Sequence, residues 1–240
     1  MIGVVVPVHD EEACLGACLE ALRAAATCAL LAGEAVGIVI VLDACSDGSQ
    51  RIAHAHAMHA DARWRLDCIA IDRRNVGAAR AAGAQLLLQR GARWLAFTDA
   101  DTRVSPTWLS TQLGLHADAV CGSVGVDDWS PHEHSADALR AHFERSYTDA
   151  DDHRHIHGAN LGVCASAYLR AGGFAPLACS EDVALVAALQ ASGARIAWSA
   201  APRVTTSARR NARARGGFGD TLLQVVEAMA TQTAATDLAT

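Results

Sequence analysis

The chain alternates short apolar runs with segments of helical periodicity from its first residues. Leucines at helical spacing over residues 11–26 predict one helix, Asp47 opens a second that runs to about residue 60, and an Ala-rich helix follows Asn75 to about residue 89. The apolar runs of strand length cover residues 3–8, 36–42, 66–71 and 93–98. This alternation predicts a parallel sheet with right-handed crossovers.

Carboxylates follow three of these four strands. Glu11 lies just beyond the first strand, Asp43 just beyond the second, and Asp99 with Asp101 just beyond the fourth. Because open α/β sheets bind their ligands outside the carboxyl ends of the strands, we expect these side chains to gather along one edge. The sequence therefore predicts a polar ligand site at that edge of the sheet.

The Asp99-Ala100-Asp101 segment indicates what that ligand is. Side chains two residues apart share a face of an extended chain, so both carboxylates can meet one ion. Hard divalent cations take oxygen ligands and are often shared with substrate phosphates. The pair predicts a Mg²⁺ or Mn²⁺ site that holds a diphosphate, and a solvated polar turn is the simpler alternative.

Composition narrows the class of protein. With 240 residues, 51% of them hydrophobic and 5% aromatic, the chain can form one large globular α/β domain or two small ones. Its basic residues are all Arg, which excludes a Schiff-base lysine and a P-loop lysine. A formal net charge of −6 gives no reason to expect nucleic-acid binding.

Cysteine usage and hydropathy predict where the protein resides. The eight cysteines include no Cys-x-x-Cys pair, so we expect reduced thiols rather than a zinc ribbon or a disulfide scaffold. The chain enters an apolar strand at Ile2 without a charged leader, and no apolar run reaches transmembrane length. We therefore expect a cytoplasmic protein with no integral membrane segment.

Seven motifs, in order, resemble the family 2 glycosyltransferases. They occupy residues 5–12, 41–49, 75–83, 97–101, 158–161, 172–174 and 180–182. The resemblance runs from about residue 3 to residue 207 and implies the GT-A fold. That fold is α/β and Rossmann-like, with a doubly wound, mostly parallel sheet and a mixed C-terminal acceptor half.

The resemblance also implies a domain organisation. A single GT-A domain would span residues 1–220, with its nucleotide-sugar-binding half at 1–101 and its acceptor half at 102–220. Residues 221–240 would then form a C-terminal helix and tail, which either packs on the core or mediates a homodimer. The implied activity is metal-dependent transfer of a sugar from a nucleotide diphosphate sugar donor to an acceptor hydroxyl, usually with inversion.

By the same resemblance, individual residues take roles. Asp101 would be the direct metal ligand, whereas Asp99 would bind the metal, the ribose or the donor sugar. Asp182 would be the general base, with Glu181 as the second choice, at the start of a helix that Ser180 can cap. The residues expected to bind the nucleotide or donor are Pro7, His9, Glu11, Asp43, Arg80 and Asp99.

The segment 205–219 combines arginines with a Gly-rich stretch. Arg guanidinium groups suit phosphate, and Gly hinges allow a lid to close over a donor. We therefore expect Arg209 or Arg210 to reach the diphosphate, and a solvated basic loop is the alternative.

The acceptor pocket is expected to include Trp129, His157 and Asn160. Trp129 follows a further predicted strand at residues 119–126 and offers a stacking surface for a sugar. His153, His155 and His157 alternate, so a strand would place them on one side, and a three-His zinc site is one alternative. We favour a loop that borders the acceptor pocket.

Three other functions remain open from the sequence. A sugar-nucleotide pyrophosphorylase would be expected to show a Gly-rich, Arg- and Lys-containing loop after the first strand, where this chain has Pro-Val-His-Asp-Glu-Glu. A non-catalytic nucleotide-sugar-binding partner is opposed by the four acids Asp99, Asp101, Glu181 and Asp182. A retaining transferase is the third.

Overall fold

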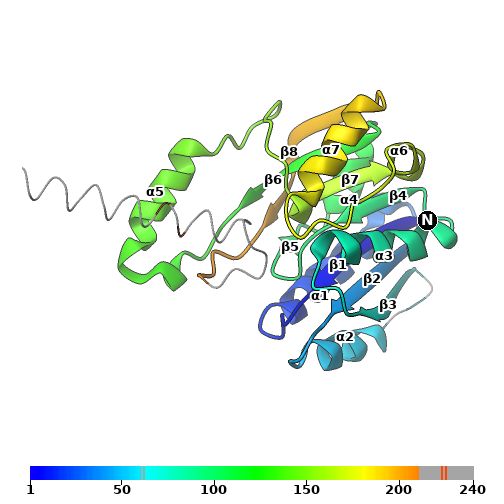
Figure 1. Ribbon diagram of the computed structural model, residues 1–240, viewed down its shortest axis with the longest axis horizontal. Coiled ribbons are helices and arrows are strands. Elements are labelled where there is room, and N and C mark those ends of the chain that lie inside the picture. The colour runs from blue at the N-terminus through cyan, green and yellow to red at the C-terminus, as the bar shows by residue number, and fades with distance from the viewer. Residues whose placement is uncertain (60, 62, 211–222, 224, 226–240) are drawn as a thin grey trace, which may run out of the picture. The chain divides into compact units, whose positions relative to one another are not determined.

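The computed structural model describes residues 1–59, 61, 63–210, 223 and 225, which fall into two compact units (Figure 1). The first unit comprises Met1–Gly125 and Asp149–Thr206, and the second comprises Val126–Thr148 with the residues that follow from Ser207. The domain boundary expected at residue 220, and nearly all of the helix and tail expected over residues 221–240, lie outside the described residues.

The whole sheet of the structure lies in the first unit. Its strands are β1 Ile2–Val8, β2 Val36–Asp43, β3 Trp64–Ile71, β4 Trp94–Phe97, β5 Arg103–Val104, β6 Ala119–Gly125, β7 Leu161–Cys164 and β8 Ile196–Thr205. They hydrogen-bond in the order β3-β2-β1-β4-β7-β6-β8-β5.

Strand direction divides this sheet into a parallel half and a mixed half. Strands β3, β2, β1 and β4 are all parallel. Strand β7 is antiparallel to both of its neighbours, β4 and β6, while β6 and β8 are parallel and β5 is antiparallel to β8. The predicted doubly wound sheet with a mixed second half is confirmed.

Helices cover both faces of the parallel half. The chain passes from β1 through α1 (Leu15–Ala26) to β2, and through α2 (Ser49–Ala57) to β3, before α3 (Val76–Gln89) returns it to β4. Because crossovers between parallel strands are right-handed, this reversal puts α3 on the face opposite α1 and α2. The other helices of the first unit are η1 Ala29–Leu31, α4 Trp108–Gly114, η3 Gly158–Asn160, α6 Ala165–Arg170 and α7 Glu181–Ala191.

The core on the α3 face is built from alternate strand residues. Val5, Val39 and Val41 point toward α3, where Leu87 is fully buried, and Phe97 extends the same layer. Helices α3, α6 and α7 pack on this face together (Figure 1). The residues of α7 in this core are Leu185, Val186 and Leu189.

The second unit has a small core of its own. It contains η2 (Ser130–Ser135) and α5 (Ala136–Ser146), and Trp129, Leu139 and Ala208 form its interior. No helix among the described residues is both long enough and apolar enough to span a bilayer.

Three local expectations are corrected by the structure. Helix α1 begins at Leu15 instead of residue 11, because the acidic residues ahead of it bond to the loop after β2. Ser180 adopts a left-handed backbone conformation (φ 58°) and makes no side-chain cap hydrogen bond to α7. Residues 153–157 form no strand.

Candidate active site

The loops after β1 and β2 are tied together at the carboxyl edge of the sheet. The carboxylate of Asp10 accepts hydrogen bonds from the backbone N–H groups of Ser46 (2.6 Å) and Asp47 (3.2 Å). The Ser46 N–H is the main reason why the pKa of Asp10 lies below its usual value. The Gly48 N–H also donates to the Glu12 carboxylate at 2.8 Å, and in the opposite direction the Glu12 N–H donates to the Asp47 carboxylate at 2.9 Å. These reciprocal bonds make the two acidic loops one structure.

Asp43 shapes the loop that leads into α3. It is only 4% exposed, and its two oxygens accept from the backbone N–H groups of Arg73 (2.7 Å), Arg74 (2.8 Å) and Asn75 (2.8 Å). A ring nitrogen of His9 lies 2.7 Å from the Asp43 carbonyl oxygen. Asp43 therefore orders residues 73–75 in addition to the nucleoside contact predicted for it.

The first turn of α3 holds the segment that precedes α7. Asn75 caps α3 by accepting from the Ala78 N–H at 2.8 Å, and its side-chain amide donates to the Pro176 carbonyl at 3.0 Å. The Gly77 N–H donates to the Leu177 carbonyl at 3.1 Å. The loop ordered by Asp43 is thus attached to the chain just before Glu181 and Asp182.

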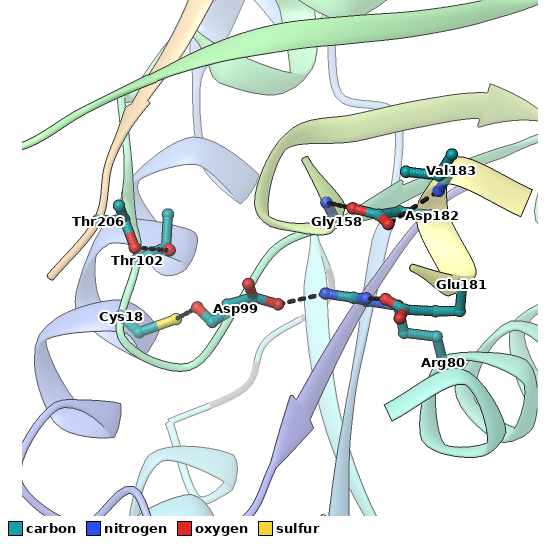
Figure 2. Close-up of polar contacts among 9 residues, drawn as sticks. All are labelled: Cys18, Arg80, Asp99, Thr102, Gly158, Glu181, Asp182, Val183 and Thr206. Carbon is teal, nitrogen blue, oxygen red and sulfur yellow. Dashed lines mark hydrogen bonds and ion pairs between the residues drawn. The ribbon is translucent and has the colours of Figure 1, made fainter. Parts of the chain in front are cut away.

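Arg80 lies at the centre of the site (Figure 2). Its side chain is 3% exposed, and its two terminal nitrogens pair with Glu181 and, at 2.5 Å, with Asp99. The guanidinium carbon lies 5.8 Å from the ring centre of Phe174. Arg80 and Glu181 are 101 positions apart in the chain, so no local sequence pattern predicts that they pair.

A buried thiol contacts the backbone of the Asp99-Ala100-Asp101 segment. The Cys18 thiol donates to the Asp99 carbonyl oxygen at 3.5 Å (Figure 2). Burial raises the pKa of Cys18, and the negative charges of Asp101 and Asp99 raise it further. Cys18 therefore stays a neutral thiol. It was not among the predicted site residues, because a single cysteine in a helix matches no functional sequence motif.

Two carboxylates are a suitable but incomplete set for a hard divalent cation. Oxygen ligands fit Mg²⁺ or Mn²⁺, and such ions complete their shell with water and substrate phosphates. Among the described residues, no group of three or more His, Cys, Asp or Glu side chains is arranged to hold a metal. This arrangement fits an ion that is shared with a phosphate-bearing ligand.

Helix α7 begins with two acids in different environments. Glu181 is 4% exposed and is paired with Arg80. Asp182 is more accessible, and its oxygens accept from the backbone N–H groups of Gly158 (2.7 Å) and Val183 (2.8 Å) (Figure 2). These bonds orient the Asp182 carboxylate beside the turn that precedes β7.

The three alternating histidines stack instead of converging. The ring centres of His153 and His155 are 5.5 Å apart, and those of His155 and His157 are 6.0 Å apart. The three-His zinc site considered above is absent from the described residues. Burial lowers the pKa of His157 to about 4, with a further contribution from its neighbours His155 and His153.

The acceptor contact expected for Asn160 is corrected by its burial. Asn160 is 0% exposed, so it has no surface through which to meet a substrate. Its side-chain oxygen accepts from the Trp108 indole at 2.9 Å, and its amide donates to the carbonyls of Ser123 (2.8 Å) and Pro202 (2.5 Å). Asn160 instead joins α4, β6 and β8.

Three predicted site residues belong to the second unit. Trp129 is 8% exposed and packs there against Phe143, with ring centres 5.6 Å apart. The backbone N–H of Arg209 donates to the Ser207 hydroxyl at 3.2 Å, and Arg210 is exposed. The sugar contact of Trp129 and the diphosphate contact of Arg209 or Arg210 stay predictions.

The fold and these residues define a class of protein. A parallel half with acidic strand ends, a mixed second half and a helix that opens with paired acids make up the GT-A glycosyltransferase fold. The model of glycosyl transferase family 2 matches residues 3–170, and the chain belongs to that family.

Solved structures of similar fold include a mannosyltransferase and a glucosyl-3-phosphoglycerate synthase. S. aureus TarS 1–349 matches with a TM-score of 0.58 and 13% identity over 86% of this chain and 60% of that one. The mannosyltransferase PcManGT from Pyrobaculum calidifontis, in complex with GDP-Man and Mn²⁺, matches with a TM-score of 0.58 and 18% identity over 90% and 58%. M. tuberculosis glucosyl-3-phosphoglycerate synthase matches with a TM-score of 0.56 and 16% identity over 88% and 73%.

These likenesses establish the fold alone, because the identities are low. The chain spans about three fifths of the length of the first two, TarS 1–349 and PcManGT. No curated protein matches the chain.

Proposed function

We propose that this chain transfers a glycosyl unit from a nucleoside diphosphate sugar to an acceptor hydroxyl, with a divalent cation bound at Asp99 and Asp101. The observation that carries the proposal is the direct connection, through Arg80, between Asp99 at the end of β4 and the acids that open α7. Family membership supports it, as do two similar solved structures, PcManGT in complex with GDP-Man and Mn²⁺ and S. aureus TarS 1–349 in complex with UDP.

Asp99 and Asp101 would hold Mn²⁺ or Mg²⁺ on the donor diphosphate. When bound, the ion neutralises the charge that develops on the departing nucleoside diphosphate. Asp101 is the stronger candidate for the direct ligand, because membership of family 2 implies this role for the second carboxylate of the segment. Pro7, His9, Glu11 and Asp43 belong to the neighbouring strand ends and would surround the nucleoside.

Asp182 would act as the general base. Two backbone N–H groups hold its carboxylate in place, and its partial exposure lets it meet an acceptor hydroxyl. Glu181 is less suited to this step, because it is buried and already paired with Arg80. A hydroxyl deprotonated by Asp182 would attack the anomeric carbon in one displacement, which inverts its configuration. His157 would border the acceptor.

Donor turnover tests this function. We expect the protein to release nucleoside diphosphate from at least one member of a panel of nucleoside diphosphate sugars when Mn²⁺ is present. Asp182→Asn should slow release and transfer by on the order of 10²–10⁴-fold, because it removes the positioned base. The matched control is Asp67→Asn. Asp67 lies on β3 and forms an ion pair with Arg90, so this variant should leave the rate unchanged.

Two outcomes would contradict the proposal. Binding of a nucleotide sugar without turnover under any acceptor condition would indicate a non-catalytic binding protein. An unchanged rate in Asp182→Asn would show that Asp182 is not the general base. The anomeric configuration of the product, measured by NMR, decides between inversion and retention.

A further inference from the structure

A buried cluster of three charges connects separate elements of the first unit. Arg80 comes from α3, Asp99 from the loop after β4, and Glu181 from the first residue of α7. Arg80 and Glu181 are almost fully buried, while the Asp99 side chain is 36% exposed. Figure 2 shows the guanidinium lying between the two carboxylates. The cluster therefore reaches from the donor side of the site into the core.

The guanidinium is fixed in its plane by its surroundings. One terminal nitrogen donates to Glu181 and the other donates to Asp99. A lysine ammonium does not provide this forked geometry. Phe174 packs 5.8 Å from the guanidinium carbon. A side chain at Gly158 would overlap both terminal nitrogens, so the space beside residue 158 is filled by Arg80. A buried, ion-paired guanidinium has little freedom to move away.

Anchoring Glu181 also anchors its neighbour. Glu181 and Asp182 are consecutive residues in the first turn of α7, and Asp182 bonds to the Gly158 N–H beside the same guanidinium. Any shift of Glu181 relative to Asp99 would therefore move the Asp182 carboxylate as well. A displacement of about 1 Å at a reacting group can cost on the order of 100-fold in rate.

We infer that Arg80 is a positioning residue, which sets the distance between the donor-side carboxylates and Asp182 by bridging Asp99 and Glu181. In this arrangement Glu181 anchors α7 through its pair with Arg80 and is not the base. Arg80 acts through the two carboxylates and not by contact with the nucleotide. The inference rests on the proposed function for its consequence in catalysis, but the bridge itself can be tested without turnover.

The first experiment is a stability cycle. Arg80→Met should lower the melting temperature by on the order of 10 °C, because it leaves the buried Glu181 carboxylate without a partner. The double variant Arg80→Met with Glu181→Met should recover at least half of that loss, because it removes both buried charges together. Additive losses in the double variant would overturn the inference, whether or not the wild-type protein turns over a donor.

The second experiment separates positioning from nucleotide contact. Arg80→Lys keeps the charge but not the fork, so we expect kcat to fall by roughly tenfold to a hundredfold. The Kd of the nucleoside diphosphate with Mn²⁺, measured by calorimetry, should change by less than about threefold. Gly158→Ala should reproduce this kcat defect, and Arg90→Lys, at the surface pair with Asp67, is the control.

These measurements also separate the two proposals. A wild-type protein that turns over no donor contradicts the proposed function. The stability cycle would still show whether Arg80 and Glu181 stabilise each other. An active wild type with full kcat in Arg80→Lys contradicts the inference alone. A tenfold or larger loss of nucleotide affinity in Arg80→Lys would instead show that Arg80 contacts the nucleotide. The stability-restored double variant should stay slow, because Asp99 still lacks its partner.

Discussion

His157 is an uncharged imidazole in a site rich in carboxylates. Burial opposes its protonation, and the other two histidines of the stack add repulsion, so its pKa lies at about 4 in the folded protein. The unfolded value is about 6.5. Between these two pH values the unfolded chain binds a proton that the folded protein does not bind. Stability must therefore fall as the pH falls from about 6.5 towards about 4.

This dependence can be measured in the metal-free protein. We expect the urea midpoint of the wild type to drop over that pH range, and His157→Asn to flatten the drop by removing the titrating ring. His54→Asn, at an exposed position of α2, is the matched control and should follow the wild type. Parallel curves for wild type and His157→Asn would contradict the role of this burial.

Among individual residues, the acids of the site were more predictable from the sequence than the partners they bind. Asp43 is the last residue of β2, and Asp99 and Asp101 follow β4, so their position at the sheet edge could be predicted from periodicity alone. The pairing of Arg80 with Glu181 joins positions 101 apart, and only the packing of α3 against α7 creates it. Asn160 was misjudged because burial of a polar residue is not visible in a local motif.

At the scale of elements, the approach of the residue 175–177 segment to the first turn of α3 is unusually close. A Cβ at Gly77 would overlap the Ala175 carbonyl oxygen and would lie 2.8 Å from the Leu177 carbonyl oxygen. Only glycine permits this approach, because backbone atoms on the other side have no flexible end to move away. Because Gly77 has no side chain, the segment before α7 can pack directly against α3.

Glycine-to-alanine substitutions test this contact. Gly77→Ala should destabilise the protein by about 1–3 kcal/mol and lower turnover, because the added methyl pushes the segment before α7 away from α3. Gly16→Ala is the matched control: Gly16 is also helical, in α1, and nothing lies within 4 Å of its added Cβ. It should stabilise by about 0.5–1 kcal/mol. Chemical denaturation and donor turnover measure both, and a Gly77→Ala protein that behaves like Gly16→Ala would contradict the contact.

Elements of the parallel half were more predictable than those of the mixed half. The strands β1 to β4 are apolar runs with turn signals, and each was predicted to within two residues at either end. Strand β7 is only four residues long, and β8 contains Ser, Ala and Pro, so neither has a clear period. Their strand conformation depends on pairing with β4 and β6, which the local sequence does not encode.

At the scale of the whole molecule, charge makes the proposed ligand unfavourable without a cation. The chain carries a formal net charge of −6, and a nucleoside diphosphate is also an anion. The acidic strand ends concentrate this charge at the edge where the diphosphate would bind. A divalent ion between them converts repulsion into attraction, so affinity should depend strongly on the metal.

Metal removal therefore has a predicted effect on stability. With Mn²⁺ and a matching nucleoside diphosphate at about a hundred times its Kd, the melting temperature should rise by roughly 5–10 °C, because the ligand binds only the native state. EDTA should abolish this rise. Asp101→Asn should weaken it, whereas Asp67→Asn should preserve it. An equal rise in the presence of EDTA would contradict the metal site.

The bridge made by Arg80 also has an evolutionary consequence. Replacing Arg80 alone leaves Glu181 as a buried carboxylate without its partner, so this single substitution costs more stability than replacing the two residues together. Among homologous chains, the two positions are therefore expected to covary as a long-range pair, and Gly158 to remain glycine wherever arginine is kept at position 80. This three-position signature would mark members of the family that assemble their site in the same way.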